Sequence, residues 1–367
     1  MGGATAAGTR TFAEAFAREL PAAHFRALDG LTVSSIGLGT YLGDEDDEAD
    51  RGYGEAIVYA ANLGCNLFDT AINYRAQRSE RVLGQALAAL ERDGSFRREQ
   101  LVFCTKGGYL AFDGGVPPDP SQYVVDTYIR PGVIAPEDVV GGAHCMTPRY
   151  LENQLARSLR NLGVATVDVY YVHNPETQLT AVSRAEFLTR IRAAFECLER
   201  EVALGRIGRY GVATWNGFRK PSGARDHLSL EELVRAAEAA AGGPGHHFKV
   251  IQLPYNLAMP EAHAAATQRV EGEAMTTFEA ATRLGVATVA SASILQGQLA
   301  QRLPPQVADA LPGLETAAQR ALQFVRSTSG VTAALVGMAC PPHVEENLHV
   351  ARTVPSPAGV DSLFERR

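Results

Sequence analysis

The chain has 367 residues, of which 46% are hydrophobic and 20% charged, enough for a sizeable core in one large domain or two ordinary ones. The formal net charge is -7 and no Lys/Arg-rich run occurs, which argues against nucleic acid or an anionic membrane surface as a partner. No stretch of about twenty apolar residues is present, so we expect no membrane span.

The N-terminus and the cysteines point to an intracellular location. Residues 1–18 contain no apolar segment of the kind that secretory signals carry. The five cysteines are an odd number, and three of them lie in or beside apolar strand patterns. We therefore expect free, buried thiols and a cytoplasmic protein.

From residue 31 onward, apolar strand patterns alternate with amphipathic helix patterns. Strands are predicted at residues 33–38, 65–69, 101–105, 167–173, 207–213, 249–253, 286–290 and 333–337. Helices are predicted after them at residues 50–63, 79–92, 148–162, 184–204, 230–241, 271–284, 314–327 and 343–352. Strict alternation with near-continuous apolar strands predicts a parallel sheet covered by helices. Eight repeats favour closure into a single α/β domain, a (β/α)8 TIM barrel over residues 31–352.

Three segments fall outside this alternation. Residues 1–30 form an N-terminal extension with a predicted helix at 12–20, and residues 353–367 form a short C-terminal tail. Residues 107–146 form a long loop insertion after the third strand, which places it at the barrel mouth, where long loops serve as lids or substrate walls. The insertion's aromatic residues could form either a substrate wall or a small core of their own: Tyr109, Phe112, Tyr123 and Tyr128.

Three of the predicted strands end on side chains that carry chemistry. Asp69 ends the second strand and Tyr74 follows five residues later, Lys106 follows the third strand, and His173 ends the fourth. Because the C-terminal ends of the strands in a parallel barrel share one face, we expect these four side chains to converge.

This combination of groups is suited to proton transfer at a carbonyl. A tyrosine has a pKa near 10 in water, but a cation about 4 Å away favours the phenolate by roughly 4 kcal/mol at an effective dielectric constant of about 20. We therefore expect Lys106 to lower the pKa of Tyr74 toward the working pH, with Asp69 keeping Lys106 charged. His173 could donate a neutral hydrogen bond to the substrate oxygen or relay its proton.

None of these groups can deliver a hydride. A reductase built on them therefore needs a nicotinamide cofactor at the same face. Without one, Tyr74 could still act as the acid/base of a cofactor-independent lyase or isomerase, and this alternative stays open.

Further motifs around these residues resemble the aldo-keto reductases. The similar segments are Gly-Leu-Gly-Thr (37–40), Phe-Asp-Thr-Ala-x-x-Tyr (68–74), Ser-Glu-x-x-Leu-Gly-x-Ala-Leu (79–87), Thr-Lys-Gly (105–107), Ser-Leu-x-x-Leu-Gly (158–163), Gly-x-Ile-x-x-Tyr-Gly-Val (205–212) and Glu-Glu-Asn-Leu (345–348). The resemblance implies the barrel, the catalytic tetrad Asp69, Tyr74, Lys106 and His173, and NAD(P)H-dependent reduction of small-molecule carbonyl compounds or oxidation of alcohols. Some barrels of this family act as redox-silent regulatory or binding subunits, which gives a third alternative.

The cofactor segment after the eighth strand departs from the family pattern. The family holds the 2′-phosphate of NADPH with Lys or Arg there, whereas residues 337–343, from Gly337 to His343, contain neither. Only His343 could carry partial positive charge, and a phosphate dianion favours a fixed cation. Glu346 and Asn347 match the family's adenine contacts. The resemblance therefore implies NADP(H) or NAD(H) without deciding between them.

The nicotinamide side departs as well. Ser291 aligns with the aromatic residue that the family stacks on the ring, and Ala213-Thr214 replace a Ser-Asn pair that grips the carboxamide. Gln252 matches the remaining carboxamide contact, and Trp215 could help to line the pocket. We expect weak or unusual cofactor binding, although losing one stack costs only about 1 kcal/mol.

The other reactive residues favour structural interpretations. Cys104 and Cys340 flank the predicted site, but small core residues are the better interpretation of both. The pairs His144-Cys145 and His246-His247 lack the ligand spacing of zinc sites, so no metal is predicted.

Overall fold

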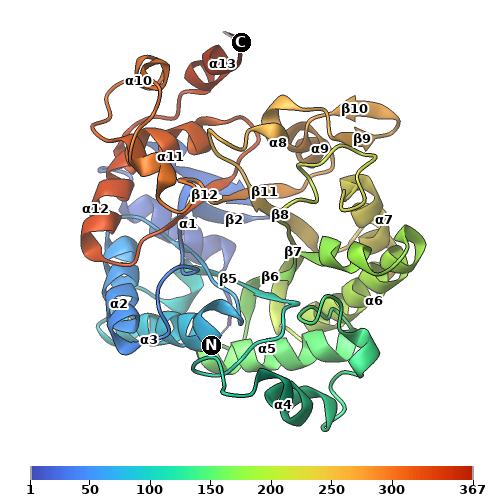
Figure 1. Cartoon of the computed structure of the whole chain (residues 1–367). Coiled ribbons are helices and arrows are strands. Elements are labelled where there is room, and N and C mark those ends of the chain that lie inside the picture. Colours follow the sequence, from blue (N-terminus) through green and yellow to red (C-terminus); the bar gives the residue numbers. More distant parts are fainter. Residues whose placement is uncertain (1, 366–367) are drawn as a thin grey trace.

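In the computed structural model, which describes residues 2–365, eight strands close into a parallel barrel surrounded by helices (Figure 1). In spatial order the barrel strands are β11 (Ala287–Ser291), β12 (Ala333–Gly337), β3 (Ile36–Gly39), β4 (Leu67–Asp69), β5 (Val102–Gly107), β6 (Val167–His173), β7 (Ile207–Ala213) and β8 (Phe248–Pro254). Neighbouring strands pair in parallel all the way round. The predicted (β/α)8 TIM barrel is confirmed.

Helices that follow the barrel strands cover the outside of the barrel. They are α2 (Asp47–Asn62), α3 (Arg78–Arg92), α5 (Pro148–Leu162), α6 (Arg184–Ala203), α7 (Leu230–Ala241), α9 (Thr277–Arg283), α11 (Ala317–Ser327) and α12 (Pro341–His349). The remaining α-helices are α1 (Ala6–Ala15), α4 (Pro120–Val124), α8 (Glu261–Ala264), α10 (Pro305–Ala310) and α13 (Pro357–Glu365). No helix among these residues is both long and apolar enough to cross a bilayer.

The barrel strands are apolar along their length because both of their faces are buried. All seven residues of β6 are buried, for example, and Val169 and Tyr171 belong to a cluster separate from the helix-facing core. An antiparallel hairpin of β1 (Phe25–Leu28) and β2 (Leu31–Ser34) adds Leu28 and Val33 to this inner cluster. The N-terminal segment therefore covers one end of the barrel and leaves the other end for the loops.

Several predicted boundaries are wrong, each for a local reason. The predicted strand 33–38 is divided between β2 and β3, and the predicted helix 12–20 is replaced by α1, which Thr5 caps through the Gly8 amide. The predicted helix 271–284 begins instead as a hairpin of β9 (Gln268–Val270) and β10 (Glu273–Met275). Glu271 and Gly272 both have positive φ, which turns the chain back before Thr276 caps α9. The tail contains α13, which the sequence did not predict.

Candidate active site

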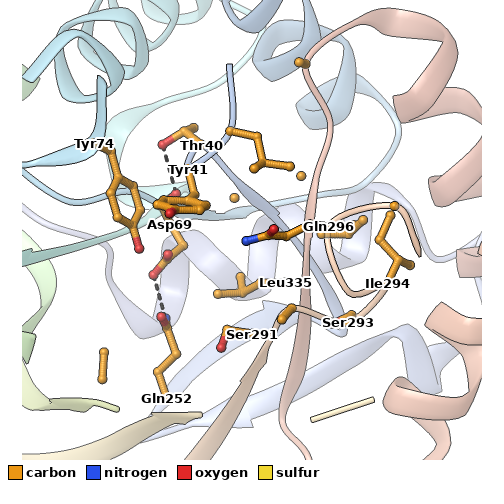
Figure 2. A pocket seen from close by; sticks show the side chains of 18 of the residues that line it. Thr40, Tyr41, Asp69, Tyr74, Gln252, Ser291, Ser293, Ile294, Gln296 and Leu335 are labelled. Atoms are coloured by element: carbon orange, nitrogen blue, oxygen red, sulfur yellow. Dashed lines mark hydrogen bonds between the residues drawn. The ribbon is translucent and has the colours of Figure 1, made fainter. Parts of the chain in front are cut away.

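Four polar side chains meet at the C-terminal end of the barrel. Asp69 ends β4, Lys106 lies on β5, and His173 ends β6, so parallel pairing of these strands brings the three residues to one rim. Tyr74 begins the turn η2 (Tyr74–Gln77), and its side chain points into the same space as Asp69 (Figure 2). The four side chains that we expected to converge therefore lie together at this rim.

Lys106 is fully buried and bonded on two sides. Its Nζ donates to Asp69 Oδ1 at 2.5 Å and to the Thr70 carbonyl at 2.8 Å, and it lies 4.7 Å from the centre of the Tyr74 ring. The other carboxylate oxygen, Asp69 Oδ2, accepts from Gln252 Nε2 at 2.7 Å. Burial disfavours the ammonium, but the charge of Asp69 and the hydrogen bond to its carboxylate raise the pKa of Lys106 above its ordinary value. Lys106 is therefore a permanent cation beneath Tyr74.

The expected lowering of the Tyr74 pKa is not found. Burial raises the pKa of Tyr74 above its ordinary value, and although Lys106 lowers it, the nearby Asp69 carboxylate raises it again. The lowering by the Lys106 cation is offset by the charge of its counter-ion and by the loss of water around the phenol. In these surroundings Tyr74 is therefore a protonated phenol at neutral pH.

An unusual turn presents Tyr74 to the cavity. The three residues after it, Arg75, Ala76 and Gln77, all have positive φ, at 46°, 49° and 73°. Each such conformation of a non-glycine residue costs of order 1–3 kcal/mol and persists only where the surroundings enforce it. The Arg75 guanidinium enforces it here by donating to the Asp50 carboxylate at 2.6 Å and to two backbone carbonyls of the loop before α2.

His173 is held by ring packing rather than by a hydrogen bond. Its ring lies edge-on to Tyr74, with centroids 5.8 Å apart, and edge-on to Tyr109, at 5.1 Å. Its Nδ1 is buried and has no partner in the described structure. Burial, the Lys106 charge and His144 lower the pKa of His173 well below 6.5, so the imidazole is neutral at physiological pH.

A cavity of about 770 Å³ extends from Asp69, Tyr74 and His173 to α12. Its size lies within the range of small-molecule and cofactor sites. The residues predicted from the sequence to contact a cofactor all line it: Gln252, Ser291, Gly337, His343, Glu346 and Asn347. Trp215 lines it too, as does Tyr41, whose ring centre is 5.0 Å from that of Tyr74 and which the sequence argument did not identify.

Polar atoms at three places along this cavity are buried without a partner in the described residues. They are His173 Nδ1 beside the tetrad, Ser293 Oγ after β11, and Asn347 Oδ1 on α12. Buried polar groups are nearly always hydrogen-bonded, so these three atoms are exceptions among the residues that line the cavity.

The loop after β11 forms one wall, and sequence reasoning recognised only its first residue. Ala292, Leu295 and Gln296 have positive φ, and the amides of Ser293, Ile294 and Gln296 donate to no acceptor in residues 2–365. Ser293, Ile294 and Gln296 lie together on the side of the pocket opposite Tyr74 in Figure 2. Free amides in such turns suit phosphate oxygens without any cation. The sequence gives little warning of this conformation, because Gly297 is the loop's one glycine.

The pair Ala213-Thr214 does not offer a free hydroxyl to the cavity. Thr214 Oγ1 donates to Glu176 Oε1 at 2.5 Å, and the amide of Trp215 donates to the same oxygen at 2.9 Å. Glu176 thus fixes the loop after β7, a role the sequence argument did not recognise. The Gln252 amide nitrogen is likewise engaged by Asp69, which leaves its oxygen for a carboxamide contact.

The segment after β12 carries no fixed cation. Pro341 and Pro342 occupy the first turn of α12, so two of the amides that a helix normally offers to an anion are missing. No Lys or Arg lines the cavity in the described part of the chain, whereas the carboxylate-bearing Glu346 does. The negative charge of a 2′-phosphate bound here would be offset by few amides and by no lysine or arginine of the cavity lining in residues 2–365.

The insertion's aromatic residues divide between the two interpretations left open. Tyr109 lines the cavity, whereas Tyr128 is buried in a core that the insertion forms with α5, together with Ile134, Cys145 and Tyr150. Phe112 and Tyr123 pack against each other, with centroids 5.4 Å apart.

The remaining reactive residues have structural environments. All five cysteines are free, and Cys104 lies in the barrel's inner cluster. Within residues 2–365 no group of three or more His, Cys, Asp or Glu side chains could hold a metal ion.

A family model and the similar curated proteins point to the same family of enzymes. Residues 35–309 match the model of the "Aldo/keto reductase family". The NADH-specific methylglyoxal reductase of Escherichia coli is 29% identical over 214 residues, covering 55% of this chain and 54% of that protein. The D-threo-aldose 1-dehydrogenase of a Pseudomonas species is 26% identical over 195 residues, covering 51% and 52%. The chain thus spans about half the length of the curated relatives it matches.

Solved structures share the fold at low sequence identity. An aldo-keto reductase from Bacillus halodurans in its holo form superposes with a TM-score of 0.62 at 20% identity, covering 93% of this chain and 95% of that one. An aldo/keto reductase from Klebsiella pneumoniae in complex with NADP and acetate gives a TM-score of 0.61 at 20% identity, covering 94% and 95%.

Proposed function

The chain belongs to the aldo/keto reductase family, and we propose that it is a nicotinamide-dependent oxidoreductase that reduces small-molecule carbonyl compounds or oxidises the corresponding alcohols. The observation that supports this most strongly is the meeting of Asp69, Tyr74, Lys106 and His173 at one end of a cavity large enough for cofactor and substrate. This arrangement offers a proton donor, a fixed cation and a neutral imidazole to one reacting oxygen.

In this proposal Tyr74 donates its phenolic proton to the carbonyl oxygen during reduction, and the phenolate takes a proton back during alcohol oxidation. Lys106 stabilises the phenolate that forms, and Asp69 keeps Lys106 charged and in place. His173, being neutral, donates a hydrogen bond that orients the carbonyl. A bound nicotinamide supplies the hydride.

We propose that the cofactor is NAD(H) in preference to NADP(H). Gln252 and Ser291 would contact the nicotinamide end, the amides after Ser291 the phosphates, and Glu346 and Asn347 the adenosine end. The supporting features are the two prolines that open α12, the Glu346 carboxylate on the cavity wall and the lack of a lining Lys or Arg in residues 2–365. The name of the similar Escherichia coli reductase, which is NADH-specific, agrees with this preference.

Titration of the purified protein with NADH and NADPH, followed by nicotinamide fluorescence, tests the proposal. We expect saturable binding of NADH, weaker binding of NADPH, and dinucleotide-dependent reduction of at least one compound in a panel of small aldehydes. Absence of binding by either dinucleotide would instead favour the lyase or isomerase alternative. Binding without turnover of any carbonyl or alcohol would favour the redox-silent subunit.

A further inference from the structure

We propose that His144, in the insertion, is a positioning residue of the active site, because it holds the end of β6 and thereby the imidazole of His173. This inference rests on the proposed function for its catalytic meaning. The geometry that carries it consists of one hydrogen-bonded chain and one set of packed rings.

The chain of hydrogen bonds begins on α6. Arg190 Nη1 donates to Gln178 Oε1 at 2.7 Å, and Gln178 Nε2 lies 2.9 Å from His144 Nδ1. His144 Nε2 lies 2.7 Å from the backbone carbonyl oxygen of His173.

The direction of donation along these hydrogen bonds follows from Arg190. Arginine can only donate, so it fixes the oxygen of the Gln178 amide as the acceptor and its nitrogen as the donor. The nitrogen then requires an unprotonated Nδ1 on His144, which puts the proton on Nε2, where it is donated to the His173 carbonyl. Burial lowers the pKa of His144 to about 4, so this neutral tautomer persists at physiological pH.

The ring packing completes the arrangement. Tyr109 lies edge-on to His144 at 5.3 Å and edge-on to His173 at 5.1 Å. An antiparallel bridge joins Tyr109 to His144, so the two ends of the insertion meet at this point. Gly108 permits the approach, because a Cβ there would lie 2.8 Å from the His173 carbonyl oxygen and 3.0 Å from His144 Nε2.

His173 depends on this support because its side chain makes no hydrogen bond to the described protein. Its Nδ1 is unpartnered, so the ring is oriented by its backbone and by the rings of Tyr74 and Tyr109. Catalytic geometry must be held within about 0.5 Å, and a misplacement of about 1 Å can cost about 10²-fold in rate. The insertion is therefore part of the site's framework as well as its rim.

The test compares three variants. His144→Phe keeps a ring but removes both nitrogens, and His144→Gln keeps an N–H donor near the position of Nε2. Tyr128→Phe is the matched control for the insertion's own stability, because it removes the 2.6 Å hydrogen bond to the Ala111 carbonyl without touching His173.

We expect His144→Phe to lower kcat about 10- to 100-fold with little change in the Kd for NADH. His144→Gln should recover most of that loss, and Tyr128→Phe should lower thermal stability but not kcat. Equal losses of kcat in His144→Phe and Tyr128→Phe, or no loss in His144→Phe, would overturn the proposal.

A second readout is independent of turnover. In protein labelled with ¹⁵N-histidine, the ring signals of His173, assigned from their loss in His173→Asn, should shift and broaden in His144→Phe but not in Tyr128→Phe. Unchanged His173 signals in His144→Phe would overturn the positioning role even if the wild-type protein proved inactive. Failure of the proposed function would appear separately, as wild-type protein that binds no dinucleotide.

Discussion

The two ends of the barrel each hold a buried ion pair, and the surroundings of the two pairs differ. At the N-terminal end, Arg98 donates to Asp168 Oδ2 at 2.7 Å, and the amides of Phe103 and Ala4 donate to the same carboxylate at 2.7 and 2.5 Å. At the C-terminal end, Lys106 and Asp69 form a comparable pair, but it adjoins the cavity and lies under the Tyr74 ring.

The comparison shows how one kind of interaction serves two purposes. The Arg98–Asp168 pair joins the N-terminal segment to β5 and β6, so it contributes to the fold. The Lys106–Asp69 pair leaves its cation facing a phenol at the edge of a cavity. Variants at the two ends should therefore separate activity from stability.

The largest effect is expected from Tyr74→Phe. Removing the proton donor should lower kcat by about 10²–10⁴-fold, the usual contribution of general acid catalysis. Thermal unfolding should change little, because the lost hydroxyl faces the cavity. Steady-state kinetics measures kcat, and a thermal melting curve measures stability. Retained turnover in Tyr74→Phe would refute the role of Tyr74.

The opposite pattern is expected from Asp168→Ala. This change leaves Arg98 buried without its counter-ion, which typically costs about 3–5 kcal/mol of unfolding free energy. The kcat per folded molecule should stay at the wild-type level, since the pair lies at the other end of the barrel. Urea unfolding with active-site titration measures the two quantities, and a large loss of kcat in the folded fraction would contradict the division between the ends.

The proposed preference for NADH over NADPH can be tested with His343→Arg. A guanidinium at the start of α12 should raise the affinity for NADPH about tenfold, corresponding to about 1.4 kcal/mol, while the affinity for NADH changes less. Fluorescence titration with both dinucleotides measures the ratio. The matched change His349→Arg, on the same helix but outside the cavity lining, should leave the ratio unaltered. An equal gain in both variants would mean that general charge, not the site, is responsible.

The smallest effect concerns pH. Tyr74 must be protonated to donate, and burial raises its pKa above the ordinary value of 10.0, so the donor form persists through neutral pH and is lost only in alkaline solution. The pKa of His173 lies well below 6.5, so its neutral form also persists. The rate of carbonyl reduction should therefore be flat over roughly pH 6.5 to 8.5. A clear inflection of kcat/KM within that range would show that a different group controls the proton.

Much of this architecture was predictable from local patterns. Alternating apolar strands and amphipathic helices indicate the barrel, and the strand-end positions of Asp69, Lys106 and His173 indicate one shared rim. The errors arise where the chain departs from regular periodicity. Glu271-Gly272 turns a predicted helix into a hairpin, and the positive φ values after Tyr74 and Ser291 involve mostly non-glycine residues, which carry no local signal.

Long-range effects were the other source of error. The pKa of Tyr74 depends on how completely burial and the Asp69 charge offset Lys106, which spacing along the chain does not reveal. His144 in the insertion contacts the His173 carbonyl on β6 directly, and Gln178 and Arg190 hold the other side of the His144 ring. Such contacts appear only once the insertion is placed over the barrel.

The most direct test of the central claim is a single-turnover experiment. Protein loaded with NADH is mixed with a reactive aldehyde such as p-nitrobenzaldehyde, and oxidation of the bound nicotinamide is followed by absorbance in wild type and Tyr74→Phe. We expect rapid oxidation in the wild type and a rate lower by about 10²–10⁴-fold in the variant, with the same Kd for NADH. Oxidation at equal rates in both proteins would contradict it.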